Sequence, residues 1–255
     1  MPELIHIRFH DILNDFLPVS KRDRFFEYDI KKARSVKDLI ESIGIPHTEI
    51  DIIVVDQRSV DFNCLIEGGE RISVYPYSDQ PTLAPLIHNL PSRTGQARFV
   101  LDVHLGQLAS YLRMLGFDTL YRNDYDDPTL AHIAETEHRI LVTRDRRLLM
   151  RRQITCGYFI RARTPRQQIT ELLTRFDLFD YEAEVARCIS CNGIIEPVDK
   201  RDIETRLLPL TRKHYDEFYQ CQSCKKIYWE GSHFDKLQAL ITEIRTEGAT
   251  TSKAD

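Results

Sequence analysis

Two Cys-x-x-Cys pairs near the C-terminal end constrain the fold of this chain more than any other feature. Cys188 and Cys191 form the first pair, Cys221 and Cys224 form the second, and 29 residues lie between them. Two such turns offer four thiolates in the tetrahedral arrangement that Zn²⁺ prefers. Disulfides or a thioredoxin-like redox motif are the alternatives, but neither pair lies where a strand enters a helix. We therefore predict a structural Zn²⁺ in a zinc ribbon over residues 181–240.

The rest of the composition is that of a globular protein with two or three domains. Of the 255 residues, 42% are hydrophobic and 29% are charged, which excludes collagen-like and wholly disordered chains. No stretch approaches the ~20 apolar residues of a membrane span. Residues 1–6 lack the basic flank and the apolar run of a signal peptide. We expect a cytoplasmic protein, and reduced cytoplasmic thiols again favour zinc over disulfides.

Residues 1–77 have the strand and helix order of a ubiquitin-like β-grasp domain. Alternating apolar residues predict strands over 4–9, 24–30, 50–55 and 71–75, and a capping pattern at Ser35 begins a helix that ends before Gly44. Sulfur-carrier proteins of this type act through a free C-terminal Gly-Gly. Here Gly68-Gly69 is internal and predicts a hairpin turn. We therefore expect a docking or structural domain instead of a carrier.

Two segments without periodic patterns separate and follow the domains. Residues 78–96 contain three prolines and a glycine, which predicts a linker. Residues 241–255 are mostly polar and predict a flexible tail.

Residues 97–180 alternate strands and helices, which predicts an α/β domain with a parallel sheet covered by helices on both faces. Apolar runs predict strands over 98–101, 117–121, 139–143 and 157–161. Helical spacing and capping patterns predict helices over 105–115, 128–138, 146–152 and 165–176.

Two aspartates follow predicted strands directly. Asp102 comes after strand 98–101 and Asp145 after strand 139–143. The crevice outside the carboxyl ends of parallel strands is the usual functional site of such sheets. Two carboxylates that converge there repel each other unless a cation lies between them, and Mg²⁺ or Mn²⁺ prefers oxygen ligands. Asp127 is a third candidate, although an Asp before a Pro is also a common helix N-cap.

Arginines are concentrated around Asp145. Nine arginines and one acidic residue lie between Arg139 and Arg166, and residues 81–185 contain no lysine. Arginine binds phosphate in a bidentate manner and stacks on bases, which favours a nucleic-acid substrate. The alternative is a solvated helix face.

Three motifs carry a resemblance to a known family. They are Phe99-Val100-Leu101-Asp102, the helix from Leu105 that ends in Leu115-Gly116-Phe117-Asp118, and Arg139 to Asp145. Together they resemble the Mut-seven C-terminal ribonuclease family, which has a PIN-like nuclease fold, a zinc ribbon and, in many bacterial members, a ubiquitin-like domain in front. The resemblance implies a metal-dependent ribonuclease with Asp102, Asp127 and Asp145 as its acidic site.

The substrate implied by the resemblance is RNA. We assign the binding of its phosphates to four arginines, Arg113, Arg144, Arg146 and Arg147.

Two alternatives stay open. Many family members have an acidic residue directly after the first aspartate, where this chain has Val103. Loss of that carboxylate favours a degenerate nuclease fold that binds RNA or a ribonucleoprotein without cutting it. The other alternative is an adaptor whose β-grasp domain recruits a protein partner.

Overall fold

The computed structural model describes residues 3–77, 86–90, 96–231, 239 and 242–244. The chain divides into two compact units. The first consists of residues 1–96 and 127–159, and the second of residues 97–126 and 160–255. Most of the predicted linker and most of the predicted tail lie outside the described residues.

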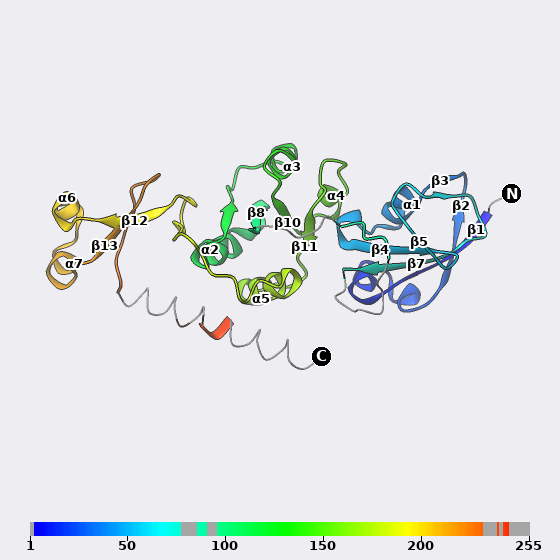
Figure 1. Ribbon diagram of the computed structural model, residues 1–255, viewed down its shortest axis with the longest axis horizontal. Helices are drawn as coiled ribbons and strands as arrows, with labels where there is room; N and C mark the ends of the chain where they lie inside the picture. The colour runs from blue at the N-terminus through cyan, green and yellow to red at the C-terminus, as the bar shows by residue number, and fades with distance from the viewer. Residues whose placement is uncertain (1–2, 78–85, 91–95, 232–238, 240–241, 245–255) are drawn as a thin grey trace. The chain divides into compact units, whose positions relative to one another are not determined.

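The first unit contains a five-stranded sheet with the strand order β2-β1-β7-β4-β5 (Figure 1). Its strands are β1 (Glu3–Phe9), β2 (Phe26–Ile30), β4 (Ile50–Val55), β5 (Arg58–Val60) and β7 (Arg71–Pro76). Strands β1 and β7 are parallel, and the other neighbours are antiparallel. The short strands β3 (Arg34–Ser35) and β6 (Leu65–Ile66) pair separately.

Helix α1 (Val36–Ile43) covers one face of this sheet (Figure 1). The hydroxyl of Ser35 accepts a hydrogen bond from the Asp38 backbone N–H at 3.1 Å, which caps the helix as the sequence predicts. Gly44 ends the helix with φ of 104°, a left-handed conformation that glycine adopts without steric cost. The helix buries Val36, Leu39 and Ile40 in the same core as β1 and β7.

The prediction of a hairpin at Gly68-Gly69 is wrong, although both glycines have positive φ, 135° and 89°. Strand β6 before them pairs with β3, whereas β7 after them pairs with β1 and β4. Each of the two glycines donates a backbone hydrogen bond that holds the turn. The Glu70 carboxylate accepts the Gly68 N–H, and the Gly69 N–H donates to the Leu4 carbonyl.

Short 3-10 helices, which the sequence pattern did not predict, connect the strands of this sheet. They are η1 (Asp11–Phe16), η2 (Val19–Lys21) and η3 (His47–Glu49). Part of the predicted linker also lies on the sheet, because the Asn89 N–H donates to the Asp51 carbonyl at 2.7 Å.

The first unit also contains α3 (Asp127–Thr136), β10 (Ile140–Thr143), α4 (Arg146–Leu149) and β11 (Gly157–Phe159). The second unit begins with β8 (Arg98–Leu101), η5 (Val103–Leu105), α2 (Gly106–Met114) and β9 (Asp118–Leu120), and continues with α5 (Pro165–Phe176). The sheet order is β11-β10-β8-β9, and the pairs β10/β11 and β8/β9 are parallel. The predicted parallel sheet is therefore confirmed.

Aromatic side chains form the core between α2, α5 and β8. The ring of Phe99 makes edge-to-face contacts with those of Phe117 and Phe176, at centroid distances of 5.7 and 6.1 Å. Helix α5 begins as predicted, with the Thr164 hydroxyl accepting from the Gln167 N–H and Pro165 in the first turn.

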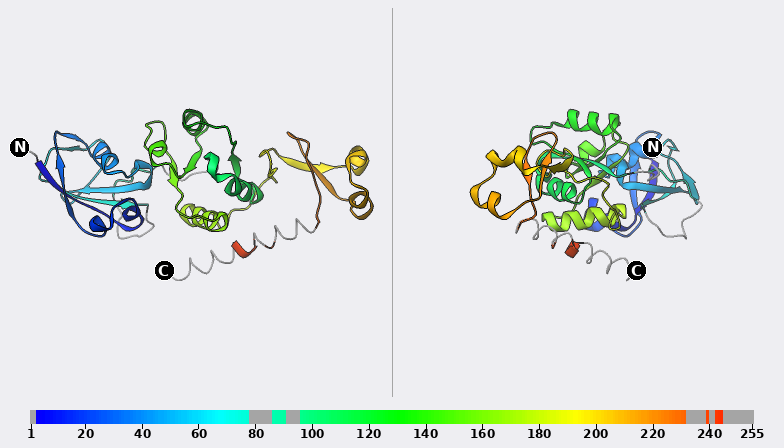
Figure 2. Two further views of the ribbon diagram at one scale, coloured as in Figure 1. Left: turned by 180° about the vertical axis from the view of Figure 1, so that it is seen from behind. Right: turned by 60° about the vertical axis from the view of Figure 1, so that its left-hand side comes forward.

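The C-terminal region of the second unit is a three-stranded antiparallel sheet (Figure 2). Its strands are β12 (Ile195–Val198), β13 (Phe218–Cys221) and β14 (Ile227–Tyr228). The insert between the two cysteine pairs is ordered, because it contains β12, α6 (Lys200–Ile203), η6 (Glu204–Arg206) and α7 (Pro209–His214). Helices α6 and α7 lie together beyond one end of β12 and β13 (Figures 1 and 2).

Candidate functional site

The four paired cysteines meet in one cluster. All four sulfur atoms lie within 4.8 Å of one another. The Cys188 and Cys224 sulfurs are 3.6 Å apart, and those of Cys191 and Cys221 are 3.4 Å apart. A disulfide requires ~2.05 Å, whereas thiolates at ~2.3 Å from one tetrahedral Zn²⁺ are ~3.8 Å apart. The cluster therefore fits a metal ion such as zinc. Among the described residues, no other group of three or more His, Cys, Asp or Glu side chains gathers this closely.

The protonation of these thiols also suits a cation. Burial raises the pKa of Cys188, but hydrogen bonds from the Tyr228 hydroxyl at 3.0 Å and from the Cys191 N–H outweigh it and lower the pKa to about 6. Burial raises the pKa of Cys191 to about 12. A divalent cation stabilises all four as thiolates, because its charge offsets their mutual repulsion.

The first cysteine turn is bound to strand β9 by the residue that follows it. Asn192 has φ of 70°, and its side chain is buried. Its amide oxygen accepts the Thr119 N–H at 2.9 Å, and its amide nitrogen donates to Asp118 at 2.7 Å. The Asn192 side chain therefore joins the cysteine turn to the edge of the parallel sheet.

Arg113, predicted to bind substrate, is buried within the second unit. The side chain is 4% exposed, and its guanidinium donates to the Thr119 carbonyl at 2.9 Å and to the Ile189 and Ser190 carbonyls at 3.0 and 3.2 Å. These bonds connect α2 and β9 to the first cysteine turn. The residue type suggested phosphate binding, but its place on the buried face of α2 commits its donors to backbone carbonyls.

Asp102 ends β8 as predicted and caps the turn that follows. Its carboxylate accepts the Val103 N–H at 2.6 Å. The Tyr121 hydroxyl donates to the Val103 carbonyl at 2.9 Å and holds the other side of this turn. Gly106 makes room for Tyr121, because a Cβ on Gly106 would lie 2.7 Å from the hydroxyl oxygen. The sequence pattern did not predict this supporting role of Tyr121 and Gly106.

Asp127 is the first residue of α3, and so lies inside the helix end. Its carboxylate forms an ion pair with the Arg151 guanidinium at 3.5 Å. Arg151 belongs to the arginine-rich segment after α4, so this pair links α3 to that segment.

Asp145 follows β10 as predicted and caps α4. Its Oδ1 accepts the Arg147 N–H at 2.7 Å and the Leu148 N–H at 3.4 Å, while its own N–H donates to the Thr143 hydroxyl at 2.9 Å. The side chain is exposed. Within the part of the chain that the structure describes, its Oδ2 makes no hydrogen bond. Asp145 therefore combines a fixed orientation with an oxygen that faces solvent.

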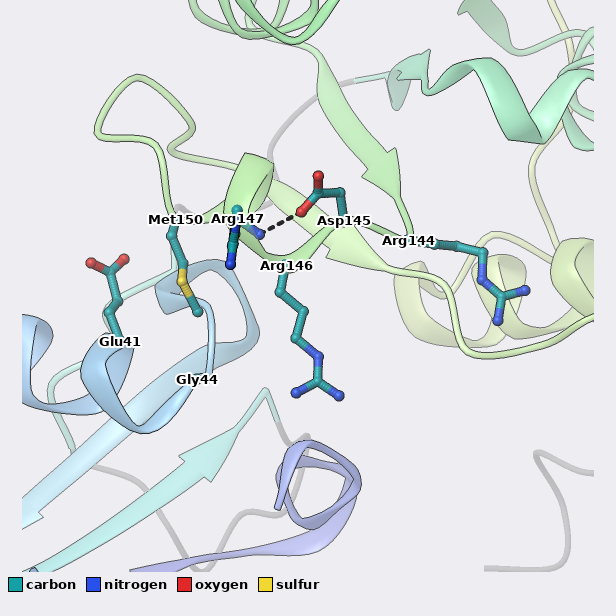
Figure 3. A pocket seen from close by; sticks show the side chains of 7 residues that line it. All are labelled: Glu41, Gly44, Arg144, Asp145, Arg146, Arg147 and Met150. Carbon is teal, nitrogen blue, oxygen red and sulfur yellow. Dashed lines mark hydrogen bonds between the residues drawn. The ribbon is translucent and has the colours of Figure 1, made fainter. Parts of the chain in front are cut away.

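An open pocket of about 640 Å³ lies beside Asp145 (Figure 3). The residues that line it are Glu41, Gly44, Arg144, Asp145, Arg146, Arg147 and Met150. Three of the four arginines predicted to bind substrate thus share one pocket. Glu41 and Gly44 come from the end of α1, about a hundred positions earlier, and no pattern in the sequence indicates that they belong here.

Arg146 is fixed within this pocket. Its guanidinium donates to the Phe16 carbonyl at 3.3 Å and lies over the Phe16 ring, 4.8 Å from its centroid. The ring of Phe159 is 5.6 Å away on another side.

Comparison with known protein families agrees with this architecture. A family model described as the Mut7-C RNAse domain matches residues 97–241. The chain belongs to the Mut7-C RNAse family. A second model, described as Mut7-C ubiquitin, matches residues 2–81. The resemblance drawn from the motifs is therefore confirmed, and a nuclease-like role follows from the Mut7-C RNAse domain.

No curated protein and no solved structure matches the chain. None of the helices in the described part of the chain has the length and apolar character needed to cross a bilayer.

Proposed function

We propose that this protein is a metal-dependent ribonuclease that hydrolyses RNA phosphodiester bonds on a PIN-like core. The observation that carries the proposal is the exposed carboxylate of Asp145, held at the end of a parallel strand in a pocket lined by three arginines. The match to the Mut7-C RNAse domain supports RNA as the substrate.

Asp102, Asp127 and Asp145 are the proposed acidic site. In the strand order β11-β10-β8-β9, Asp102 and Asp145 follow neighbouring strands. Their carboxylates are the hard oxygen ligands that Mg²⁺ or Mn²⁺ prefers, and such an ion supplies an activated water and charge stabilisation when bound. The backbone N–H groups that bind Asp102 and Asp145 orient both side chains. The pair with Arg151 orients Asp127.

The arginines around Asp145 would hold RNA. Arg144 and Arg147 are exposed, and Arg146 is fixed against Phe16. Guanidinium groups bind phosphate oxygens at short range and attract the polyanion at long range. In this proposal they place a scissile phosphate beside the Asp145 carboxylate.

The four-cysteine cluster is the proposed Zn²⁺ site. Its four sulfurs leave no open coordination position, so the zinc would be structural. Its role is to hold the first cysteine turn. Asn192 and Arg113 connect this turn to the parallel sheet.

The test of this function is cleavage of a single-stranded RNA by the purified protein with added Mn²⁺. We expect Asp145→Asn to abolish cleavage, because the charge that attracts the cation is lost while the amide oxygen can still cap α4. Asp199→Asn is the matched control, since Asp199 caps the four-residue helix α6 by the same bond to a backbone N–H. Absence of cleavage by the wild-type protein with Mg²⁺ and with Mn²⁺ would disprove the proposal.

The non-catalytic RNA-binding module is the second candidate, and Val103 favours it. The side chain after Asp102 offers no ligand atom, and the Val103 N–H and C=O are both bonded within the turn. A binder of this kind would hold RNA with a strong salt dependence. It would retain that binding in Asp145→Asn and cleave nothing in either form.

A further inference from the structure

The pocket beside Asp145 has a wall that belongs to the ubiquitin-like domain. Glu41 lies in the last turn of α1, and Gly44 ends that helix, whereas the opposite wall is formed by residues 144–150 (Figure 3). These two walls belong to the same compact unit. The ubiquitin-like domain and the arginine-rich segment therefore share this pocket.

Buried polar contacts fasten the two walls together. The Glu49 carboxylate is 1% exposed and accepts the Phe159 N–H at 2.7 Å. His47 is also buried, and its ring nitrogens lie 2.6 Å from Glu41 Oε1 and 2.8 Å from the Ile154 carbonyl oxygen. The rings of Phe16 and Phe159 add an edge-to-face contact. Burial of a carboxylate is costly unless it is hydrogen-bonded, so these contacts define one arrangement of the walls.

The pocket carries a positive charge. Three arginines and two acidic residues, Glu41 and Asp145, line it. The Glu41 carboxylate is hydrogen-bonded to the His47 ring at 2.6 Å. The Asp145 charge is partly offset by two backbone N–H groups. An anion is therefore the ligand that suits the pocket.

The size and the lining of the pocket suit a ligand larger than a single anion. A volume of about 640 Å³ exceeds what one phosphate needs and lies within the range of pockets that hold small organic ligands. Met150 supplies an apolar surface between the arginines and Glu41, as the side of a sugar or a base requires (Figure 3). Phosphates joined by sugars and bases combine these properties.

We propose that the ubiquitin-like domain forms one wall of the RNA-binding site, with the Glu41–Gly44 turn facing a ribose-phosphate segment of single-stranded RNA that the arginines hold. This inference rests on the proposed function, because it takes RNA as the substrate. It gives the domain a direct role in substrate binding, unlike a protein-recruiting adaptor.

Gly44 allows a test with closely matched variants of the full chain. A Cβ on Gly44 would meet no atom within 4 Å, and Asp and Asn are the residues that best tolerate its positive φ. We expect Gly44→Asp to weaken binding of a labelled single-stranded RNA about tenfold at low salt, because it adds a negative charge to the pocket. Gly44→Asn has nearly the same shape and strain without the charge, so it is the reference against which the tenfold loss is measured.

Glu41→Gln tests the same wall in the opposite direction. Glutamine keeps an oxygen for His47 but removes a negative charge, so RNA should bind several-fold more tightly, and a folding defect cannot produce that result. Binding is measured without added Mg²⁺ or Mn²⁺ at two salt concentrations, and both effects should shrink at high salt. Equal affinity of Gly44→Asp and Gly44→Asn, or no gain in Glu41→Gln, would overturn the inference.

The outcome is separable from that of the proposed ribonuclease. If Gly44→Asp binds and cleaves RNA like the wild type while Asp145→Asn does not cleave, the enzyme stands and this wall is not part of its site. If the Gly44 and Glu41 variants change binding but no form cleaves, the wall is confirmed for an RNA-binding protein.

Discussion

Asp102 and Asp145 each cap the turn that follows them, and they are also the proposed cation ligands. One oxygen of each carboxylate accepts a backbone N–H, at 2.6 Å for Asp102 and 2.7 Å for Asp145. Such bonds fix the direction of the carboxylate. At residue scale, the position of each carboxylate therefore depends on neighbours that make no contact with substrate.

Gly106 is such a neighbour, and its replacement should damage the turn after Asp102. In Gly106→Ala the new Cβ would lie 2.7 Å from the Tyr121 hydroxyl oxygen, so the Tyr121 side chain or the turn that it holds has to shift. We expect a loss of roughly 1–3 kcal/mol in the free energy of unfolding, measured with urea.

Two further variants test whether the contact between Gly106 and Tyr121 is the cause. Gln107→Ala, at the exposed next position of α2, should leave stability nearly unchanged. Gly106→Ala should cost less in a Tyr121→Ala background, where the clashing atoms are gone. Equal costs in both backgrounds would mean that the clash is not the cause.

Arg113 should matter for stability and zinc affinity, in contrast to the arginines of the pocket. Arg113→Ala removes a donor from the carbonyls of Thr119, Ile189 and Ser190, the first of which is buried. We expect a loss of about 3 kcal/mol in the free energy of unfolding and weaker zinc binding in a chelator competition assay.

Arg122→Ala is the control for Arg113, since Arg122 is an exposed arginine that pairs with Asp124, two positions away in the chain. It should change neither stability nor zinc affinity appreciably. An Arg113 variant with wild-type stability but weakened RNA binding would instead support the prediction that Arg113 contacts substrate.

The individual helices and strands and the parallel sheet were largely predictable, whereas the pairing of the short strands was not. Alternation and capping patterns identified α1, α5 and the apolar strands because those signals are local. The separate pairing of β3 with β6 escaped prediction, since Leu65–Ile66 is too short to show a period. Helix α4 is also shorter than the arginine-rich segment suggested, because its pattern of Leu148 and Leu149 covers a single turn.

The cysteine turn and strand β9 should lose order together when zinc is removed. The Thr119 N–H is bound by the Asn192 side chain, directly after Cys191. We expect chelation to increase hydrogen exchange at β9 (Asp118–Leu120), while β11 (Gly157–Phe159) keeps its protection. Mass-spectrometric hydrogen exchange at matched peptides measures this difference.

Asn192→Gly separates the side-chain bonds from backbone strain, because glycine keeps the positive φ without cost. It should increase exchange at β9 even with zinc bound. Unchanged exchange in this variant and after chelation would show that the cysteine turn does not support the sheet.

At the scale of the whole molecule, the family and its domain order were predictable from three motifs and four cysteines. Only one of the two walls of the pocket beside Asp145 was predictable. Arg144, Arg146 and Arg147 are neighbours in the chain, so their grouping is visible in the sequence. The contribution of Glu41 and Gly44 depends on the contacts of His47 and Glu49 with distant backbone groups, and local patterns carry no information about such contacts.

Glu49 should connect the stability of the ubiquitin-like domain to that of the arginine-rich segment. Glu49→Ala removes a buried acceptor from the Phe159 N–H, and we expect a loss of about 1–3 kcal/mol. Thermal unfolding should then separate into two transitions, because the contact between the two parts is weakened.

Glu27→Ala is the control for Glu49, since Glu27 is exposed and its contact with His6 is long, 3.8 Å. It should cost no more than about 0.5 kcal/mol. A single cooperative transition in Glu49→Ala, at the wild-type temperature, would show that the contact is not needed for coupling.

The contacts of His47 and Glu49 join residues that are far apart in the chain, which has a consequence for protein synthesis. The His47 ring and the Ile154 carbonyl are 107 positions apart, and Glu49 and Phe159 are 110 apart. A ribosome adds about 5–20 residues per second. The β-grasp sheet therefore leaves the exit tunnel many seconds before Ile154 and Phe159 do. During that interval the loop that contains His47 and Glu49 faces water. A nascent chain stalled before residue 150 should consequently resist protease within the sheet while remaining cleavable near His47 and Glu49.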